Sequence, residues 1–104
     1  MLKLTLERYG FEVVAASHGV DALMQFRGCE GRFGSIIANH DMPVLNGLSL
    51  VRAVREMGYT GKIVVMSGRL SVAELYLYAP YAISGFFSKP FEISMLAAML
   101  QHSA

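Results

Sequence analysis

The chain has 104 residues and a net charge of +1, and 54% of its residues are hydrophobic against 16% charged. This length and composition predict one domain over residues 1–104 and exclude a disordered chain. The small net charge removes the electrostatic basis for binding nucleic acid. No apolar run reaches the roughly 18 residues that span a membrane, and residues 1–7 lack the apolar core of a secretory signal. The single cysteine, Cys29, excludes an internal disulfide, so we predict a cytoplasmic location.

The first half of the chain alternates helical and extended patterns. Apolar residues at helical spacing predict a helix over residues 2–9. The short, valine-containing segment 11–16 predicts a strand, and a helix is expected over residues 20–27. A glycine-punctuated loop leads to a short apolar strand at 35–38, and residues 39–47 are expected to form a loop.

The second half continues this alternation. A helix is predicted over residues 48–57 with Asn46 as its N-cap, and the next β-branched run, residues 62–66, predicts a strand. Residues 85–88 predict another short strand, and an apolar stripe predicts a last helix after Pro90. The charged residues of the 48–57 helix that we expect to face water are Arg52, Arg55 and Glu56.

Between these strands, Ser71 and Glu74 form a capping-box pattern, which opens a helix that Pro80 limits. The side chains expected to face inward from this helix are those of Val72, Leu75, Tyr76 and Ala79.

Strands that are apolar on both faces and alternate with helices predict a parallel sheet covered on both sides, a three-layer α/β sandwich. In such sheets, sites lie at the carboxyl ends of the strands. The polar residues expected there are Asn39, Ser67, Ser88 and Lys89.

Four segments, in this order and spacing, give the chain a specific resemblance to a known family. Residues 19–23 read G-V-D-A-L, and residues 39–47 read N-H-D-M-P-V-L-N-G, similar to the motif D-x-x-M-P-x-x-[DN]-G. Residues 64–68 read V-V-M-S-G, and residues 87–91 read F-S-K-P-F. Over essentially its whole length the chain resembles the CheY-like receiver domain of response regulators. The resemblance implies a flavodoxin-like parallel sheet.

In that family an aspartate accepts a phosphoryl group beside Mg²⁺, and a hydroxyl and a lysine hold the phosphoryl oxygens. The resemblance places Asn39 at the phosphoacceptor position, and Ser67 and Lys89 at the phosphoryl-binding positions. A neutral amide is a poor nucleophile, so we expect Asn39 to form no acyl phosphate. The resemblance also implies a cis bond between Lys89 and Pro90.

The family's acidic pair follows a first strand that precedes the first helix, whereas Met1 falls inside that helix. We therefore expect a sheet without the usual first strand and no bound cofactor, because the acidic ligands of Mg²⁺ are missing. Asp41 is a weak metal candidate, because one carboxylate and some carbonyls carry too little charge for a dedicated Mg²⁺ site. As a surrogate nucleophile Asp41 is disfavoured, since the family uses the backbone carbonyl at this position and the side chain should point elsewhere.

Aromatic residues suggest a contact surface. Phe86 matches the family's switch aromatic, and we expect it to be buried. Tyr76, Tyr78 and Tyr81 cluster in an apolar stretch that one sheet cannot bury on all sides, so part of this stretch is expected to be exposed as a protein interface. The alternative is ordinary tyrosines with hydrated hydroxyls.

We predict a phosphorylation-independent interaction module of two-component signalling, with a histidine kinase or another signalling protein as partner, and no enzyme activity. A second interpretation is a fragment of a phospho-accepting response regulator whose first strand and acidic pair lie upstream of Met1. A third is a hydrolase using Ser67, His40 and Asp41, although no nucleophile elbow supports it.

The missing strand would leave the edges of segments 11–16 and 35–38 unpaired. Either these two segments close up into a four-stranded sheet, or two chains associate. We favour a homodimer because so much of the composition is apolar.

Overall fold

The computed structural model describes residues 2–16, 18–28, 32–41, 46–68, 71–88 and 92–101. At its centre is a three-stranded parallel sheet in the order β1-β2-β3. The strands are β1 (Ser35–Asn39), β2 (Lys62–Ser67) and β3 (Gly85–Ser88). The helices are α1 (Leu2–Arg8), α2 (Gly19–Gly28), α3 (Gly47–Glu56), α4 (Val72–Tyr78), the single 3₁₀ turn η1 (Ala79–Tyr81) and α5 (Ile93–Gln101).

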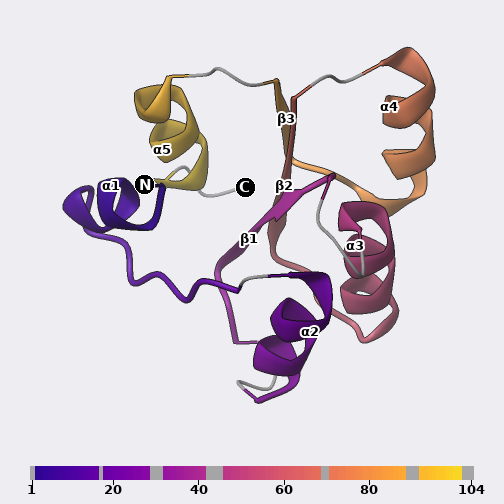
Figure 1. Ribbon diagram of the computed structural model, residues 1–104, viewed down its shortest axis with the longest axis horizontal. Coiled ribbons are helices and arrows are strands. Elements are labelled where there is room, and N and C mark those ends of the chain that lie inside the picture. Colours follow the sequence, from indigo (N-terminus) through magenta and orange to yellow (C-terminus); the bar gives the residue numbers. More distant parts are fainter. Residues whose placement is uncertain are drawn as a thin grey trace.

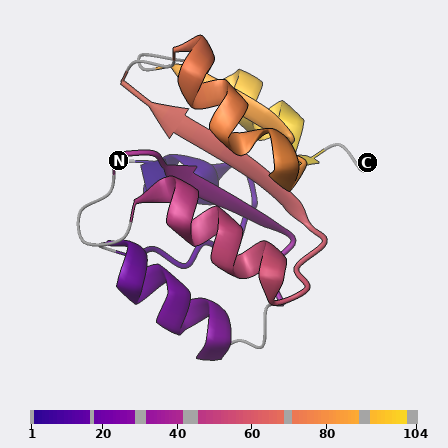
Figure 2. The same cartoon turned by 90° about the vertical axis from the view of Figure 1, so that its right-hand side faces the viewer.

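Helices cover both faces of the sheet, which confirms the predicted three-layer sandwich. Helices α1 and α5 lie on one side, and α3 and α4 lie on the other, with α2 next to α3 (Figure 1). Figure 2, turned by 90°, shows α3 running between α2 and α4. Among the described residues, no helix has the length and apolarity needed to cross a membrane.

Two apolar clusters pack against opposite faces of β2. Ile63 and Val65 join the cluster under α2, α3 and α4, while Val64 joins Leu6 of α1 and Leu96 of α5. Side chains alternate between the faces of a strand, so a strand covered on both sides is apolar at successive positions, as β2 is between its polar ends Lys62 and Ser67. Burying each such side chain fully contributes roughly 1.5–3 kcal/mol, which makes β2 the centre of the core.

Local signals placed the helix starts correctly. The Asn46 side chain accepts a hydrogen bond of 2.9 Å from Ser49 N at the start of α3. The capping box of Ser71 and Glu74 is formed at the start of α4. Both contacts join residues three apart, so they need no tertiary structure.

The predicted inward face of α4 is wrong. Val72 and Tyr76 are 69% and 74% exposed, and Leu75 and Ala79 are also exposed. The side chain that α4 buries completely is that of Tyr78. Tyr78 lies one turn from Glu74, and these two side chains, rather than the predicted apolar set, are on the inward side of the short helix.

The predicted strand at residues 11–16 does not form, and neither does the four-stranded sheet that pairs it with β1. Phe11 and Val13 still pack against the cluster of Leu6, Val64 and Leu96. The segment is therefore extended and alternates like a strand, but it has no neighbouring ladder among the described residues. A strand requires that partner, because β propensity mainly reports fit to a pleated sheet surface.

Candidate functional site

Three consecutive residues, Asn39, His40 and Asp41, follow the carboxyl end of β1 and lie beside the end of β2. Asn39 ends β1 in register with Met66, next to Ser67. The His40 backbone N–H donates to the Met66 carbonyl at 2.7 Å and continues the pairing by one residue. Parallel strands end at a common edge, and the predicted placement of Asn39 and Ser67 at this edge is confirmed.

The chain turns sharply after β1. The Asn39 Oδ1 accepts a hydrogen bond of 3.2 Å from Asp41 N, which is an Asx turn. This turn directs the carboxylate of Asp41 back to the sheet, where its Oδ2 accepts from Ser67 Oγ at 3.3 Å. The expectation that the Asp41 side chain points elsewhere is therefore wrong. Ser67 is 1% exposed, so its hydroxyl meets Asp41 at the buried end of β2.

A glycine lets α3 approach this turn. A Cβ atom at Gly47 would lie 2.8 Å from both the Asn39 carbonyl oxygen and the His40 Cα. Such a contact is closer than packed atoms tolerate, and its partners are backbone atoms that cannot rotate away. The glycine of the N-H-D-M-P-V-L-N-G motif is thus required by the packing of α3 against residues 39 and 40.

His40 joins the site to α4. Its Nε2 lies 2.9 Å from Glu74 Oε2, and its Nδ1 lies 2.7 Å from the Tyr78 hydroxyl. The other carboxylate oxygen of Glu74 accepts from the Ser71 backbone N–H and hydroxyl. The sequence identified Glu74 as a capping residue, but no local signal connects it to a histidine 34 positions earlier.

These contacts argue against the hydrolase interpretation. A nucleophilic serine needs a base within hydrogen-bond reach. Both ring nitrogens of His40 are engaged by Glu74 and Tyr78, and the Ser67 hydroxyl donates to Asp41 instead. Ser67, His40 and Asp41 lie near one another, but they do not form a Ser–His–Asp hydrogen-bond chain.

The tyrosines separate into different environments. Tyr78 is completely buried, so it does not belong to an exposed interface, whereas Tyr76 is exposed and Tyr81 is partly buried. Burial, followed by the negative charges of Glu74 and Asp41, raises the pKa of Tyr78 to about 12. Phe86, expected to be buried, is partly buried and packs edge-on against Tyr78.

The donor set at this edge does not fit a dedicated Mg²⁺ site. Within the described ranges, no group of three His, Cys, Asp or Glu residues could hold a metal ion. The carboxylate of Asp41 accepts from Ser67, and that of Glu74 bonds His40. Mg²⁺ requires several oxygen ligands in octahedral geometry. Lys89 and the predicted cis bond to Pro90 lie outside the described residues.

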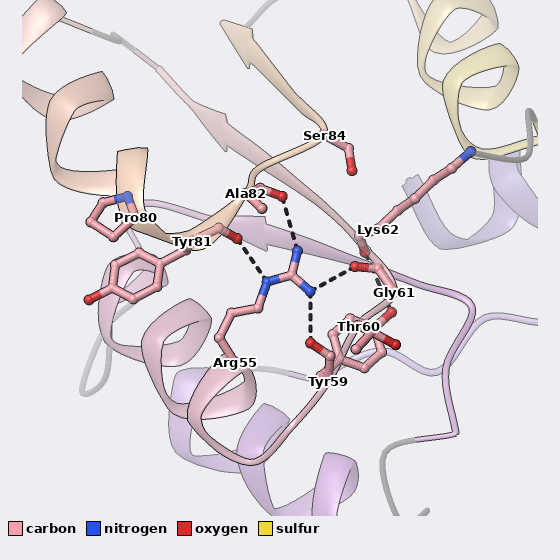
Figure 3. Close-up of a pocket in the computed structure, with 9 residues that line it drawn as sticks. All are labelled: Arg55, Tyr59, Thr60, Gly61, Lys62, Pro80, Tyr81, Ala82 and Ser84. Carbon is pink, nitrogen blue, oxygen red and sulfur yellow. Dashed lines mark hydrogen bonds between the residues drawn. The ribbon is translucent and has the colours of Figure 1, made fainter.

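A shallow groove of about 410 Å³ lies at the opposite end of the sheet, where β2 and β3 begin. Figure 3 shows the guanidinium of Arg55 in this groove and the ammonium of Lys62 pointing away. The Arg55 guanidinium donates to the carbonyls of Tyr59, Gly61, Tyr81 and Ala82 at 2.8–3.0 Å. Arg55 was expected to face water, but it instead fastens α3 to two loops.

Comparisons with known proteins agree with this architecture. The profile of the family described as "Response regulator receiver domain" matches residues 1–101. The transcriptional regulatory protein PrrA of Mycobacterium tuberculosis is 33% identical over 100 residues, which cover 96% of this chain and 42% of PrrA. The chain thus spans about two fifths of the length of this relative. Two-component response regulator 24 of Arabidopsis thaliana is 29% identical over 96 residues, 91% of this chain and 68% of that protein.

Solved structures are also similar. The chemotaxis protein CheY4 of Vibrio cholerae superimposes with a TM-score of 0.87 at 30% identity, covering 97% of this chain and 84% of that one. A response regulator of Burkholderia pseudomallei, solved with a phosphorylated aspartic acid and a calcium ion, gives a TM-score of 0.82 at 27% identity. That similarity covers 96% of this chain and 58% of that chain.

Proposed function

The chain belongs to the response regulator receiver domain family of two-component signalling, and we propose that within this family it acts as a phosphorylation-independent protein-interaction module. The observation that carries this proposal is the residue at the carboxyl end of β1. Asn39 presents a neutral amide there, and its Oδ1 already accepts from Asp41 N. An amide lacks the carboxylate oxygen that an acyl phosphate needs.

A second candidate function is phosphoryl acceptance at Asp41. Its carboxylate lies 3.3 Å from the Ser67 hydroxyl, so a carboxylate and a hydroxyl do meet at this edge. We favour the first function because the donor set of the described residues suits Mg²⁺ poorly, and phosphoryl transfer depends on charge neutralisation.

Intact-mass measurement after incubation with Mg²⁺ and acetyl phosphate separates these functions. The proposal expects no phosphoryl adduct, under conditions in which the Burkholderia response regulator serves as a positive control. An adduct that maps to Asp41 and disappears in Asp41→Asn would establish the second candidate instead.

We further propose that the exposed face of α4 binds the partner, either a histidine kinase or another signalling protein, and supports a homodimer. The exposed apolar residues of this face are Val72, Leu75, Tyr76 and Leu77. An aromatic residue with aliphatic neighbours is typical of the centre of a protein interface.

Sedimentation over a range of micromolar concentrations tests the homodimer. We expect a dimer that Tyr76→Lys dissociates. Leu4→Lys, at a similarly exposed apolar position on α1, is the matched control and should leave the dimer intact. A wild-type chain that stays monomeric at every concentration would contradict the homodimer.

A further inference from the structure

His40 connects the sheet to α4 through three separate hydrogen bonds. Its backbone N–H donates to Met66 of β2, and its ring nitrogens contact Glu74 and Tyr78. The ring also packs edge-on against the ring of Tyr78, with centroids 5.6 Å apart. His40 is thus held by the sheet and touches α4 at two positions one helical turn apart.

For a neutral imidazole at position 40, the chemistry of these groups specifies one arrangement of protons. The carboxylate of Glu74 can only accept, so His40 Nε2 carries a hydrogen and donates it. The Nδ1 of a neutral imidazole is then an acceptor, and the Tyr78 hydroxyl donates to it. Hydrogen bonds therefore run from Tyr78 to His40 and from His40 to Glu74, with each donor matched to an acceptor.

Helix α4 depends on such contacts. It has seven residues, which is too short for a helix to be stable alone in water. Its apolar side chains mostly face outward, and Tyr78 is its fully buried residue. Apolar packing of α4 against the sheet therefore rests largely on Tyr78, and the polar contacts to His40 add to it.

We propose that His40 is a positioning residue that fixes α4 against the carboxyl edge of the sheet in one arrangement, with no phosphoryl group at position 39. The exposed face of α4 is then preset for its partner. This use of the face rests on the proposed function, whereas the contact between His40 and α4 is tested without a phosphodonor or a partner.

Hydrogen exchange of the amides of α4 is the first test. His40→Phe keeps an aromatic ring and removes both nitrogens, so α4 should exchange about tenfold or more faster. The matched control is His18→Phe, because His18 Nδ1 accepts from Asp21 N at the start of α2. That variant should accelerate exchange in α2 and leave α4 unchanged. Equal protection of α4 in wild type and His40→Phe would overturn the proposal.

If His40→Phe does not fold, a second variant with a smaller change tests the same contact. Glu74→Gln retains an oxygen for Ser71 and turns an amide donor toward His40. The imidazole must then accept at Nε2 and carry its hydrogen on Nδ1. ¹⁵N NMR of the imidazoles should show the Nε2–H form of His40 in the wild type and the Nδ1–H form in Glu74→Gln, with His18 unchanged. If His40 has the same tautomer in the wild type and in Glu74→Gln, the contact between His40 and Glu74 is refuted.

These outcomes are independent of phosphorylation. A phosphoryl adduct in the mass measurement would contradict the proposed function and leave the exchange result standing. Unchanged hydrogen exchange of the α4 amides in His40→Phe would contradict the role of His40. It would leave the proposal that Asn39 is not phosphorylated unaffected.

Discussion

The buried ring of Tyr78 packs edge-on against the ring of Phe86, with centroids 5.7 Å apart and an interplanar angle of 70°. The same tyrosine reaches His40 with its hydroxyl. One side chain of α4 therefore contacts both the apolar surface of β3 and the polar end of β1. Tyrosine suits this position because its body is apolar and its tip is a hydrogen-bond donor.

The burial of Tyr78 predicts alkaline destabilisation. Its pKa is raised from 10.0 to about 12, first by burial and then by Glu74 and Asp41. The folded state therefore favours the neutral phenol. Its contribution is complete below about pH 10 and is lost as the pH rises from 10 toward 12. Such a shift corresponds to a loss of up to about 3 kcal/mol in the free energy of unfolding.

Urea unfolding at several pH values measures this loss. Tyr78→Phe should be less stable at neutral pH but should lack the part of the alkaline decline that Tyr78 causes. Tyr76→Phe, at an exposed position on the same helix, should keep the wild-type pH profile. Parallel profiles for wild type and Tyr78→Phe would show that Tyr78 titrates normally.

Arg55 predicts a stability effect that lysine cannot rescue. Its planar guanidinium serves carbonyls in two loops, and a lysine ammonium cannot reach all of them. We expect Arg55→Lys to lower the free energy of unfolding by about 2–3 kcal/mol. Arg52→Lys, at an exposed position on the same helix, should change it by less than about 0.5 kcal/mol. Equal midpoints for the two variants in urea would contradict this role.

Gly47 predicts a steric effect. In Gly47→Ala the new methyl would press on the backbone of Asn39 and His40, so we expect a loss of about 1–3 kcal/mol. The control is Gly28→Ala at the end of α2, where a Cβ meets nothing within 4 Å. That change should be neutral or stabilising by up to about 1 kcal/mol. Thermal unfolding of both variants checks the difference, and a stable Gly47→Ala protein would mean that α3 can shift.

Restoring the family's phosphoacceptor residue should not by itself restore phosphorylation. Asn39→Asp adds a carboxylate beside Asp41, but among the described residues no further acid accompanies these two at Ser67. The Mg²⁺ that would offset the added charge thus has few ligands. We expect Asn39→Asp to remain unmodified by acetyl phosphate and Mg²⁺ in intact-mass spectra. Efficient phosphorylation of this variant would show that the chain binds the metal through other groups.

Sequence patterns predicted the layers and much of the site because those features depend on short-range periodicity. The continuous apolar run of β2 required cover on both faces, and the capping residues Asn46 and Ser71 marked helix starts. The strand ends predicted that Asn39 and Ser67 lie at one edge of the sheet, as they do.

The wrong predictions all concern contacts that the local pattern does not encode. Segment 11–16 has the alternation of a strand, but pairing depends on a neighbour that no local propensity supplies. Arg55 looked like a surface residue on an amphipathic helix, yet its carbonyl partner at Tyr81 lies 26 positions away.

By itself, the sequence determined the α/β class, the strand ends and the neutral amide at Asn39, because residue identity and periodicity are properties of the chain alone. Only the tertiary structure decided that Tyr78 faces inward, that Asp41 turns back to Ser67 and that His40 contacts α4. His40 and Tyr78 are 38 positions apart, and their contact exists only because the end of β1 and the helix α4 meet over one edge of the sheet.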